Sequence, residues 1–347
     1  MINIYPINGV NLNQSKKTSR EVSYSKNVFL PITNICRNNC SYCGFRKEPG
    51  EESWFMSPEQ VLELAEKGKN SGCSEALITL GEKPEECPEA REELEEFGYD
   101  STVDYLEEMC KEILDIGLLP HTNPGVLDKK EIKRLGRYSA SMGLMLECVN
   151  ELPVHRNSPG KDPDLRLENL EIAGELKVPF TTGILIGVGE SWSDRIQSLL
   201  KLRYLQEEYN HIQEIIIQPF KPKSGTLMEN ASPPTRSEMS AIVMNARRMM
   251  PDMNIQVPPN LTPELLDYLE MGANDLGGIS TLTPDFINPE HPWPKIKNLR
   301  NKLGSKGFKL KERLPIYPNF VKNEEFMSPE VKEVVKELSN ENGYREQ

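Results

Sequence analysis

The sequence predicts an α/β barrel of the (β/α)8 type, in which eight parallel strands alternate with helices. Three observations support this fold class. The length of 347 residues fits one such barrel. Short apolar runs alternate with helix-period segments from residue 28 onward, and helix-start signals follow several of the runs. This alternation is typical of repeated βα units and a parallel sheet.

Eight strand candidates follow one another along the chain, at 28–35, 76–80, 118–122, 142–149, 180–186, 214–219, 254–257 and 275–280. Helix starts are marked by Ser57-Pro58-Glu59, Asp128, Ser191, Ser237 and Thr262-Pro263-Glu264. The last two strand candidates are short and flanked by Pro or Gly. A six-stranded partial barrel, (β/α)6, with a C-terminal extension therefore remains an alternative to the complete barrel.

The chain divides into an N-terminal extension (1–24), a barrel core (25–320) and a C-terminal tail (321–347). Active sites of αβ-barrels lie at the carboxyl ends of the strands, so motifs in those places carry most weight. The acidic, Pro-containing segment 81–99 is too long for an ordinary connection. It indicates an insertion over that face, either a lid or a solvated surface.

Composition excludes some classes of partner. The formal net charge is -12, which disfavours nucleic acid as a partner because such binding relies on concentrated Lys and Arg. A small-molecule substrate is expected instead. No run of about 18 apolar residues occurs, and the first twenty residues are too polar for a signal peptide. We expect no membrane span and a cytoplasmic location.

Three of the seven cysteines, Cys36, Cys40 and Cys43, stand within eight residues, directly after the first strand candidate. Iron-sulfur clusters normally take four cysteine ligands, so a three-cysteine site leaves one iron open. A structural zinc site is the main alternative, but it needs a fourth close Cys or His. The nearest histidine in the sequence is His121.

The spacing C-x3-C-x-aromatic-C, formed by Cys36, Cys40, Tyr42 and Cys43, resembles the defining motif of the radical SAM superfamily. The resemblance implies that the three cysteines hold one 4Fe-4S cluster and are essential for catalysis. It also implies that the open iron binds S-adenosylmethionine. Reductive cleavage would then give methionine and a 5'-deoxyadenosyl radical.

Further strand-end motifs resemble elements that contact S-adenosylmethionine in this superfamily. Gly81 and Glu82 are similar to a Gly-Gly-Glu element in which Leu80 replaces the first glycine, and a turn with a surface glutamate is the alternative. The stretch GILIGVGE, from Gly183 to Glu190, is similar to a G-x-I-x-G-x-x-E pattern, with Leu185 in the place of the isoleucine. The cofactor contacts that the sequence predicts are Tyr42, Phe45, Gly81, Glu82, Glu147, Arg166, Gly183, Ile184, Gly187 and Gln218.

Five blocks, TLGEKPE, PHTNPG, SMGLMLE, HRNSPGKDP and QPFKPKSGT, are similar to those of the CofG family, the 7,8-didemethyl-8-hydroxy-5-deazariboflavin synthases. The resemblance implies a lyase acting on 5-amino-5-(4-hydroxybenzyl)-6-(D-ribitylimino)-5,6-dihydrouracil. It would release ammonia, methionine and 5'-deoxyadenosine. The implied partners are CofH, which supplies this adduct, and an electron donor such as a ferredoxin or flavodoxin.

Polar residues at strand ends are the candidates for binding the substrate: His121, Thr122, Asn123 and His155. Two alternatives share the cofactor motifs, a biotin synthase-like and a tyrosine lyase-like radical SAM barrel. An alternative of another class is a non-catalytic iron-sulfur or zinc protein. Metal content distinguishes that last alternative from an enzyme.

Overall fold

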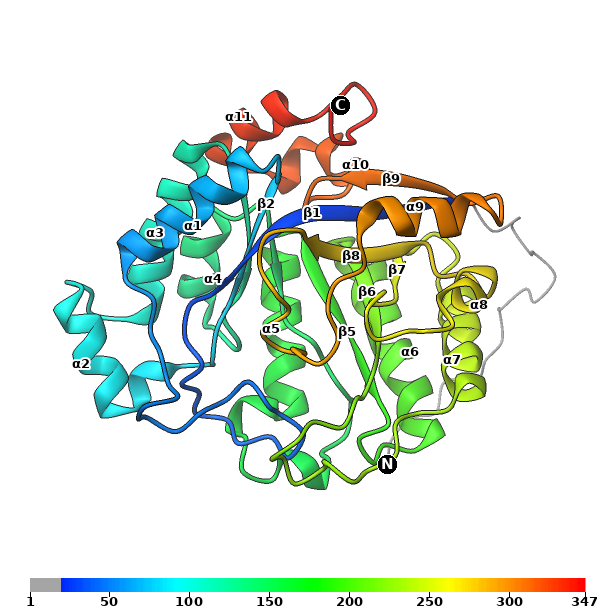
Figure 1. Ribbon diagram of the computed structural model, residues 1–347, viewed down its shortest axis with the longest axis horizontal. Helices are drawn as coiled ribbons and strands as arrows, with labels where there is room; N and C mark the ends of the chain where they lie inside the picture. The colour runs from blue at the N-terminus through cyan, green and yellow to red at the C-terminus, as the bar shows by residue number, and fades with distance from the viewer. Residues whose placement is uncertain (1–19, 347) are drawn as a thin grey trace.

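A computed structural model describes residues 20–346, in which eight parallel strands close into a barrel surrounded by helices (Figure 1). Around the ring the order is β2-β3-β4-β5-β6-β7-β8-β1, and pairing of β1 with β2 closes it. The complete barrel is therefore confirmed and the six-stranded alternative is wrong. A ninth strand, β9, lies outside the ring and pairs with the first half of β1.

The strands are β1 (Glu21–Pro31), β2 (Glu75–Thr79), β3 (Leu119–Asn123), β4 (Ser141–Gly143), β5 (Phe180–Ile186), β6 (Ile212–Pro219), β7 (Ile255–Gln256), β8 (Asp275–Ser280) and β9 (Lys309–Arg313). The α-helices are α1 (Pro58–Asn70), α2 (Pro88–Glu96), α3 (Thr102–Ile116), α4 (Lys129–Gly136), α5 (Pro163–Glu175), α6 (Trp192–Tyr209), α7 (Arg236–Met249), α8 (Leu265–Glu270), α9 (Ile296–Gly304), α10 (Pro318–Val321) and α11 (Pro329–Leu338). Short 3-10 helices are η1 (Pro84–Glu86), η2 (Pro153–His155), η3 (Pro159–Lys161) and η4 (Glu324–Phe326).

Most predicted strands have a counterpart, and β5 and β8 match their predictions at both ends. β1 starts earlier than predicted, at Glu21, so it crosses the boundary expected between residues 24 and 25. β4 stops at Gly143, well before the predicted end at residue 149. β9 was not predicted at all.

Helix starts follow local capping chemistry. Ser57, Asp128 and Ser191 cap α1, α4 and α6 as predicted, each with a reciprocal bond from the third helical residue. Two predicted starts differ. Thr235, not Ser237, caps α7, and α8 begins only after Glu264 because the Thr262 hydroxyl instead donates to the Pro258 carbonyl at 2.6 Å.

The end of the barrel where the strands begin is closed by charged groups, and we call these the barrel floor: Glu214, Asp275, Arg313 and Tyr317. The Arg313 guanidinium bonds to both carboxylate oxygens of Asp275, at 2.8 and 2.9 Å, and to Glu214 at 3.0 Å. The Tyr317 hydroxyl also bonds to Glu214. All four side chains are buried, so the floor is a paired charge network.

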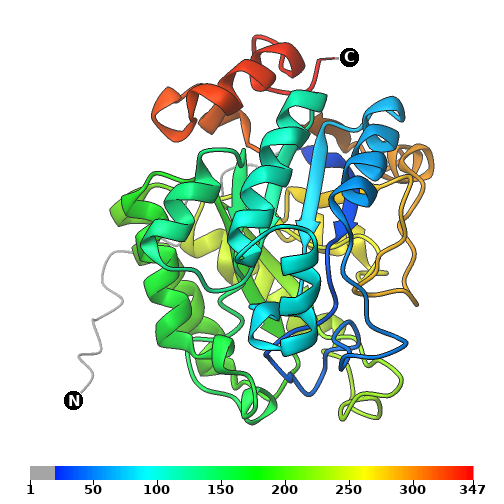
Figure 2. The same cartoon turned by 90° about the vertical axis from the view of Figure 1, so that its left-hand side faces the viewer.

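The C-terminal tail covers this floor (Figure 2). Val331, Val335 and Leu338 of α11 share an apolar cluster with Leu119 at the start of β3 and with Phe320. The tail therefore adds a small second core against the barrel floor, at the upper side of Figures 1 and 2.

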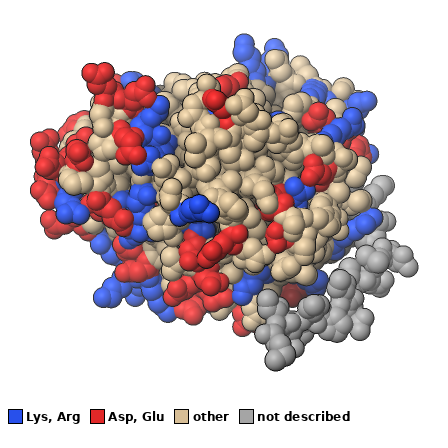
Figure 3. Space-filling view, turned by 90° about the horizontal axis from the view of Figure 1, so that it is seen from below, with Lys and Arg blue, Asp and Glu red and all other residues tan. Residues whose placement is uncertain are grey.

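The acidic segment 81–99 is an ordered excursion. Ala90 and Leu94 of α2 are buried, and the Phe97 ring packs edge-on against Phe55 at 5.9 Å. The glutamates of α2 face outward, and acidic groups gather at the corresponding edge of the molecule in Figure 3. Within residues 20–346, no helix has the length and apolar character needed to cross a membrane.

Candidate active site at the barrel mouth

The loop after β1 carries Cys36, Cys40 and Cys43 at the end where the strands finish, which we call the barrel mouth (lower side of Figure 1). Backbone bonds fix this loop to two neighbours. The Ser41 amide donates to the Val154 carbonyl at 3.0 Å, and the Arg37 amide donates to the Glu82 carbonyl at 3.0 Å. The cysteine loop is thus held between the end of β2 and the segment that follows β4.

The thiol groups of this loop receive hydrogen bonds from fixed donors. The amides of Asn38 and Glu82 donate to Cys36 Sγ at 3.4 and 3.1 Å, and the Ser158 hydroxyl donates to Cys40 Sγ at 3.3 Å. Burial raises the pKa of Cys36 to about 11 and also raises the pKa of Cys40. Donors of this kind stabilise a thiolate once a metal has displaced the proton.

The donor set is three free cysteines on one loop, Cys36, Cys40 and Cys43. A structural zinc ion takes four Cys or His ligands, whereas each cysteine of an iron-sulfur cluster binds its own iron. Three thiols, of which Cys36 and Cys40 accept hydrogen bonds, therefore fit a cluster that leaves one iron open.

Glu82 is buried at the mouth, which removes the alternative of a surface glutamate. Arg37 forms two bonds with Glu82 Oε1, at 2.7 and 2.9 Å, and the Val126 amide donates to Oε2 at 3.2 Å. A Cβ added at Gly160 would lie 1.6 Å from Oε1, and one at Gly125 would lie 2.3 Å from Cγ. Two glycines therefore leave room for this carboxylate and fix its place.

Glu147 and Arg166 meet beside it. Burial opposes ionisation of Glu147, but Lys161 and Arg166 outweigh burial and lower its pKa. Lys161 forms an ion pair with Glu147, and Arg166 Nη1 lies 4.0 Å from the same carboxylate. Arg166 is buried and also donates to the carbonyls of Gly160, at 2.7 Å, and Met145. Arg166 therefore does not form an exposed helix-face ion pair. Lys161, which the sequence did not single out, also contacts these candidate residues.

Tyr42 contacts His155, which we expected to bind substrate. The Tyr42 hydroxyl and His155 Nε2 lie 3.0 Å apart, and burial lowers the pKa of His155 to about 4. His155 therefore supports the cysteine loop in this structure. With Arg156 and Ser158 it also lines a cavity of about 590 Å³.

The glycine motif of β5 has packing roles. A Cβ at Gly183 would lie 2.2 Å from the Ile216 carbonyl oxygen, and Gly187 has a positive φ of 99°. Glu190 accepts bonds from the Gly187 and Val188 amides at 2.8 Å and caps the turn. The fold needs these glycines without any cofactor.

The remaining predicted cofactor residues lie around the same mouth. Ile184 bridges to Glu147. Gln218 is half-buried near the end of β6. Phe45 is buried, with its ring edge-on to Trp54 at 5.7 Å. The mouth therefore brings most of the predicted cofactor residues to one end of the barrel.

Strand alternation separates the three candidates on β3. Ser141 Oγ donates to the Pro315 carbonyl at 2.8 Å, so it accepts from His121 Nδ1 at 2.6 Å, and His121 Nε2 is left as an acceptor inside the barrel. Asn123 lies on the same side of β3. Thr122 points the other way and bonds to Ser139 at 3.1 Å, fully buried. Thr122 is thus buried away from the side of β3 that carries His121 and Asn123, and substrate binding by Thr122 stays a prediction.

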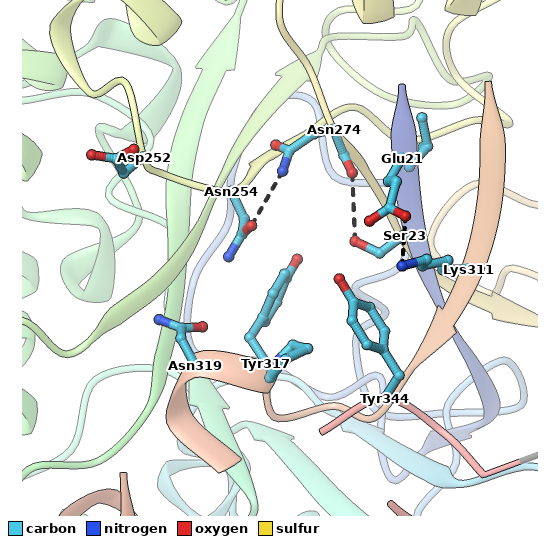
Figure 4. Close-up of a pocket in the computed structure, with 11 residues that line it drawn as sticks. Glu21, Ser23, Asp252, Asn254, Asn274, Lys311, Tyr317, Asn319 and Tyr344 are labelled. Atoms are coloured by element: carbon cyan, nitrogen blue, oxygen red, sulfur yellow. Dashed lines mark hydrogen bonds and ion pairs between the residues drawn. The ribbon is translucent and has the colours of Figure 1, made fainter. Parts of the chain in front are cut away.

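A second cavity, of about 430 Å³, lies at the opposite end of the barrel (Figure 4). Its polar side chains bond to one another: Lys311 pairs with Glu21 at 2.6 Å, and Asn274 donates to Asn254 at 3.2 Å. No residue predicted for catalysis or binding lines it. The chemistry-bearing groups thus gather at the mouth.

Comparisons with known proteins identify the family of the chain. A family model described as the radical SAM superfamily matches residues 30–202. The chain is 49% identical over 332 residues to the 7,8-didemethyl-8-hydroxy-5-deazariboflavin synthase of Methanopyrus kandleri, covering 93% of this chain and 99% of that protein. It is 52% identical over 329 residues to the synthase of the same name from Methanosarcina mazei, covering 94% and 97%.

Solved structures are similar in fold. Methylornithine synthase (PylB) matches with a TM-score of 0.66 at 21% identity, covering 84% of each chain. The FeFe-hydrogenase maturase HydG from Carboxydothermus hydrogenoformans matches with a TM-score of 0.67 at 22% identity, covering 92% of this chain and 80% of that one.

Proposed function

Since the chain belongs to the 7,8-didemethyl-8-hydroxy-5-deazariboflavin synthase family, within the radical SAM superfamily, we propose which of its residues carry that lyase reaction. The main support for the proposal is sequence identity of 49% and 52% to two synthases of this name, over nearly the whole chain. Three free cysteines on the loop after β1 support it further. The substrate would be 5-amino-5-(4-hydroxybenzyl)-6-(D-ribitylimino)-5,6-dihydrouracil, which loses ammonia as the new ring closes.

Cys36, Cys40 and Cys43 would hold one 4Fe-4S cluster with an open iron. When bound, the cluster and S-adenosylmethionine supply a carbon radical that abstracts hydrogen from an unactivated position. The amides of Asn38 and Glu82, which donate to Cys36 Sγ, would stabilise the ligand thiolate.

Glu82 would accept hydrogen bonds from the amino group of methionine, because it is an acceptor at the mouth whose place is fixed by Gly125 and Gly160. Arg166, beside Glu82 and Glu147, would bind the methionine carboxylate. Ile184 and Gln218, with Tyr42, would border the adenosine portion. His121 Nε2 and Asn123 face the barrel interior and would bind polar groups of the substrate.

The finer biological setting is also part of the proposal. The adduct would come from CofH, and the electron from a ferredoxin or flavodoxin. Seven free cysteines suit a reducing compartment, in line with the expected cytoplasmic location. We further propose that residues 25–320 supply all the catalytic groups, while the segments on either side act as structural extensions.

The test is anaerobic reconstitution of the full chain with iron and sulfide, followed by a reductant, S-adenosylmethionine and the dihydrouracil adduct. We expect the fluorescent deazaflavin, 5'-deoxyadenosine and ammonia. Formation of 5'-deoxyadenosine without deazaflavin would retain the cofactor assignment and reject the substrate. Stoichiometric zinc in place of iron would reject both.

A further inference from the structure

Four aromatic residues form a continuous surface at one side of the barrel mouth, which we call the aromatic wall: Phe29, Phe45, Trp54 and Phe286. Phe29 and Phe286 are stacked at 5.9 Å with an interplanar angle of 20°. The Trp54 ring lies 6.3 Å from Phe286 and 5.7 Å from Phe45. These rings come from β1, from the loop that carries the cysteines and from the loop after β8.

The wall belongs to the mouth, not to the core between barrel and helices. Val28 and Leu30 pack in that core, so strand alternation turns Phe29 toward the barrel interior. Phe29 and Phe45 are buried, whereas Trp54 and Phe286 are only half-buried. Part of an aromatic surface is therefore left uncovered directly beside the cysteine loop.

Fixed contacts hold the loop that carries Phe286 in place. Asp285 accepts bonds from the Ile287 and Asn288 amides, both at 2.9 Å, and from the Asn260 side chain at 2.9 Å. Lys223 reaches across from the loop after β6 and donates to the Ile287 carbonyl at 2.6 Å. Phe286 thus stands on a braced loop, as a preorganised binding surface would.

The wall borders the proposed cofactor site. The three cysteines, Tyr42 and Phe45 follow β1, and the other proposed cofactor residues follow or lie on β2, β4, β5 and β6. Trp54 and Phe286 stand on the side of the mouth formed by β1 and β8, which are neighbours in the barrel. A flat apolar group bound against these two rings would lie next to the cysteine loop.

We propose that the aromatic wall binds the 4-hydroxybenzyl group of the substrate, with Phe286 and Trp54 as the contacting rings; this rests on the proposed function. An aryl ring gains both apolar burial and ring stacking against such a surface. The Trp54 indole N–H already donates to the Pro31 carbonyl at 2.8 Å. The two rings would therefore contact the face of the aryl group and form no hydrogen bond with the aryl hydroxyl. Phe286 and Trp54 are specificity-determining residues for the aryl portion of the adduct.

The test compares Phe286→Ala with the wild type in the full reconstituted chain. We expect KM for the adduct to rise about tenfold, as loss of a stacked contact predicts. The ratio of 5'-deoxyadenosine to deazaflavin should also rise, because a poorly held substrate intercepts fewer radicals. Iron content and S-adenosylmethionine cleavage without substrate should not change.

Matched variants keep the result interpretable. Phe286→Tyr retains the aromatic ring, so its KM should match that of the wild type. Phe286→Leu retains apolar volume without the ring, so its KM should rise nearly as much as that of Phe286→Ala. Leu282→Ala removes a side chain of the same loop that is 42% exposed and should leave KM unchanged. The adduct analogue with an unsubstituted benzyl group, used as a competitor, should lose affinity for Phe286→Ala by the same factor.

An unchanged KM and product ratio in both Phe286→Ala and Phe286→Leu would overturn the proposal, as would an equal effect of Leu282→Ala. If the wild type itself formed no deazaflavin, the proposed function would fail first. If the wild type did form it and the Phe286 variants matched it, only the aryl assignment would fail.

Discussion

The mouth and the floor of the barrel both bury several charged side chains, but they satisfy them differently. At the floor, Arg313 is bonded to Asp275 and Glu214 and the network is closed on itself. At the mouth, Glu82 and Glu147 form ion pairs with Arg37 and Lys161 and lie near Arg166, and all of these groups are next to free thiols. Buried charge alone therefore does not distinguish the two ends of the barrel, whereas the free cysteines beside the charges do.

The largest expected effect is on iron content and activity, and it distinguishes a cysteine at the mouth from one at the floor end. Cys40→Ala removes one of three cluster ligands, so iron content and deazaflavin formation should fall to background. Cys73→Ala is the control, because Cys73 is buried just before β2, at the floor end. It should retain its iron and its brown absorption. Turnover by the Cys40 variant would remove the ligand assignment.

The next effect concerns the carboxylate at the mouth. Glu82→Gln keeps the volume of the side chain and an acceptor for the Val126 amide, but it loses the charge. We expect affinity for S-adenosylmethionine to drop about 10- to 100-fold, the value of one charge-assisted bond, measured by anaerobic equilibrium dialysis. Glu86→Gln, the exposed second partner of Arg37, should bind normally. Equal losses in both variants would show that Arg37, and not Glu82, governs binding.

The floor should respond in stability instead. Arg313→Met leaves Asp275 without its bidentate partner, and breaking a buried pair costs about 3–5 kcal/mol. Urea unfolding measures the loss, and the variant that remains folded should still bind S-adenosylmethionine with wild-type affinity. Lys311→Met on the same strand breaks the pair with Glu21 nearer the surface and should cost about 1 kcal/mol or less. Lost cofactor affinity in folded Arg313→Met would break the comparison.

The smallest effect lies between the two regions, at His121. Burial lowers its pKa to about 4, from a usual 6.5. As pH falls, His121 therefore takes up its proton in the unfolded chain before it does so in the folded protein. The contribution of neutral His121 to the free energy of unfolding is complete above pH 6.5 and is lost toward pH 4. At pH 5 the loss is about 2 kcal/mol. His121→Asn should flatten this part of the pH dependence of unfolding; an unchanged slope would contradict it.

Local signals made the mouth predictable. Each feature there depends on a few consecutive residues. This is true of the cysteine loop, of the strand ends around it and of the helix caps Ser57, Asp128 and Ser191. Thr122 shows the limit of such signals, because position at a strand end does not say which face a side chain occupies until the register is known.

The floor and the aromatic wall could not be predicted in this way. β9 reads KLKER, with only Leu310 as an apolar signal, and it forms because β1 is there to pair with it. Phe29 and Phe286 stack across 257 positions of sequence. Features that exist only through such distant contacts leave no pattern in a short window of sequence.

The pairing of β1 with β9 joins residues 21–25 to residues 309–313, so β1 cannot complete its pairing until the ribosome has made residue 313. A nascent chain can assemble successive βα units, but its floor stays open until that point. Such distant pairing also slows folding. We therefore expect the proposed cluster site to assemble only after residue 313 has been made, and chains interrupted before residue 309 to be directed to degradation.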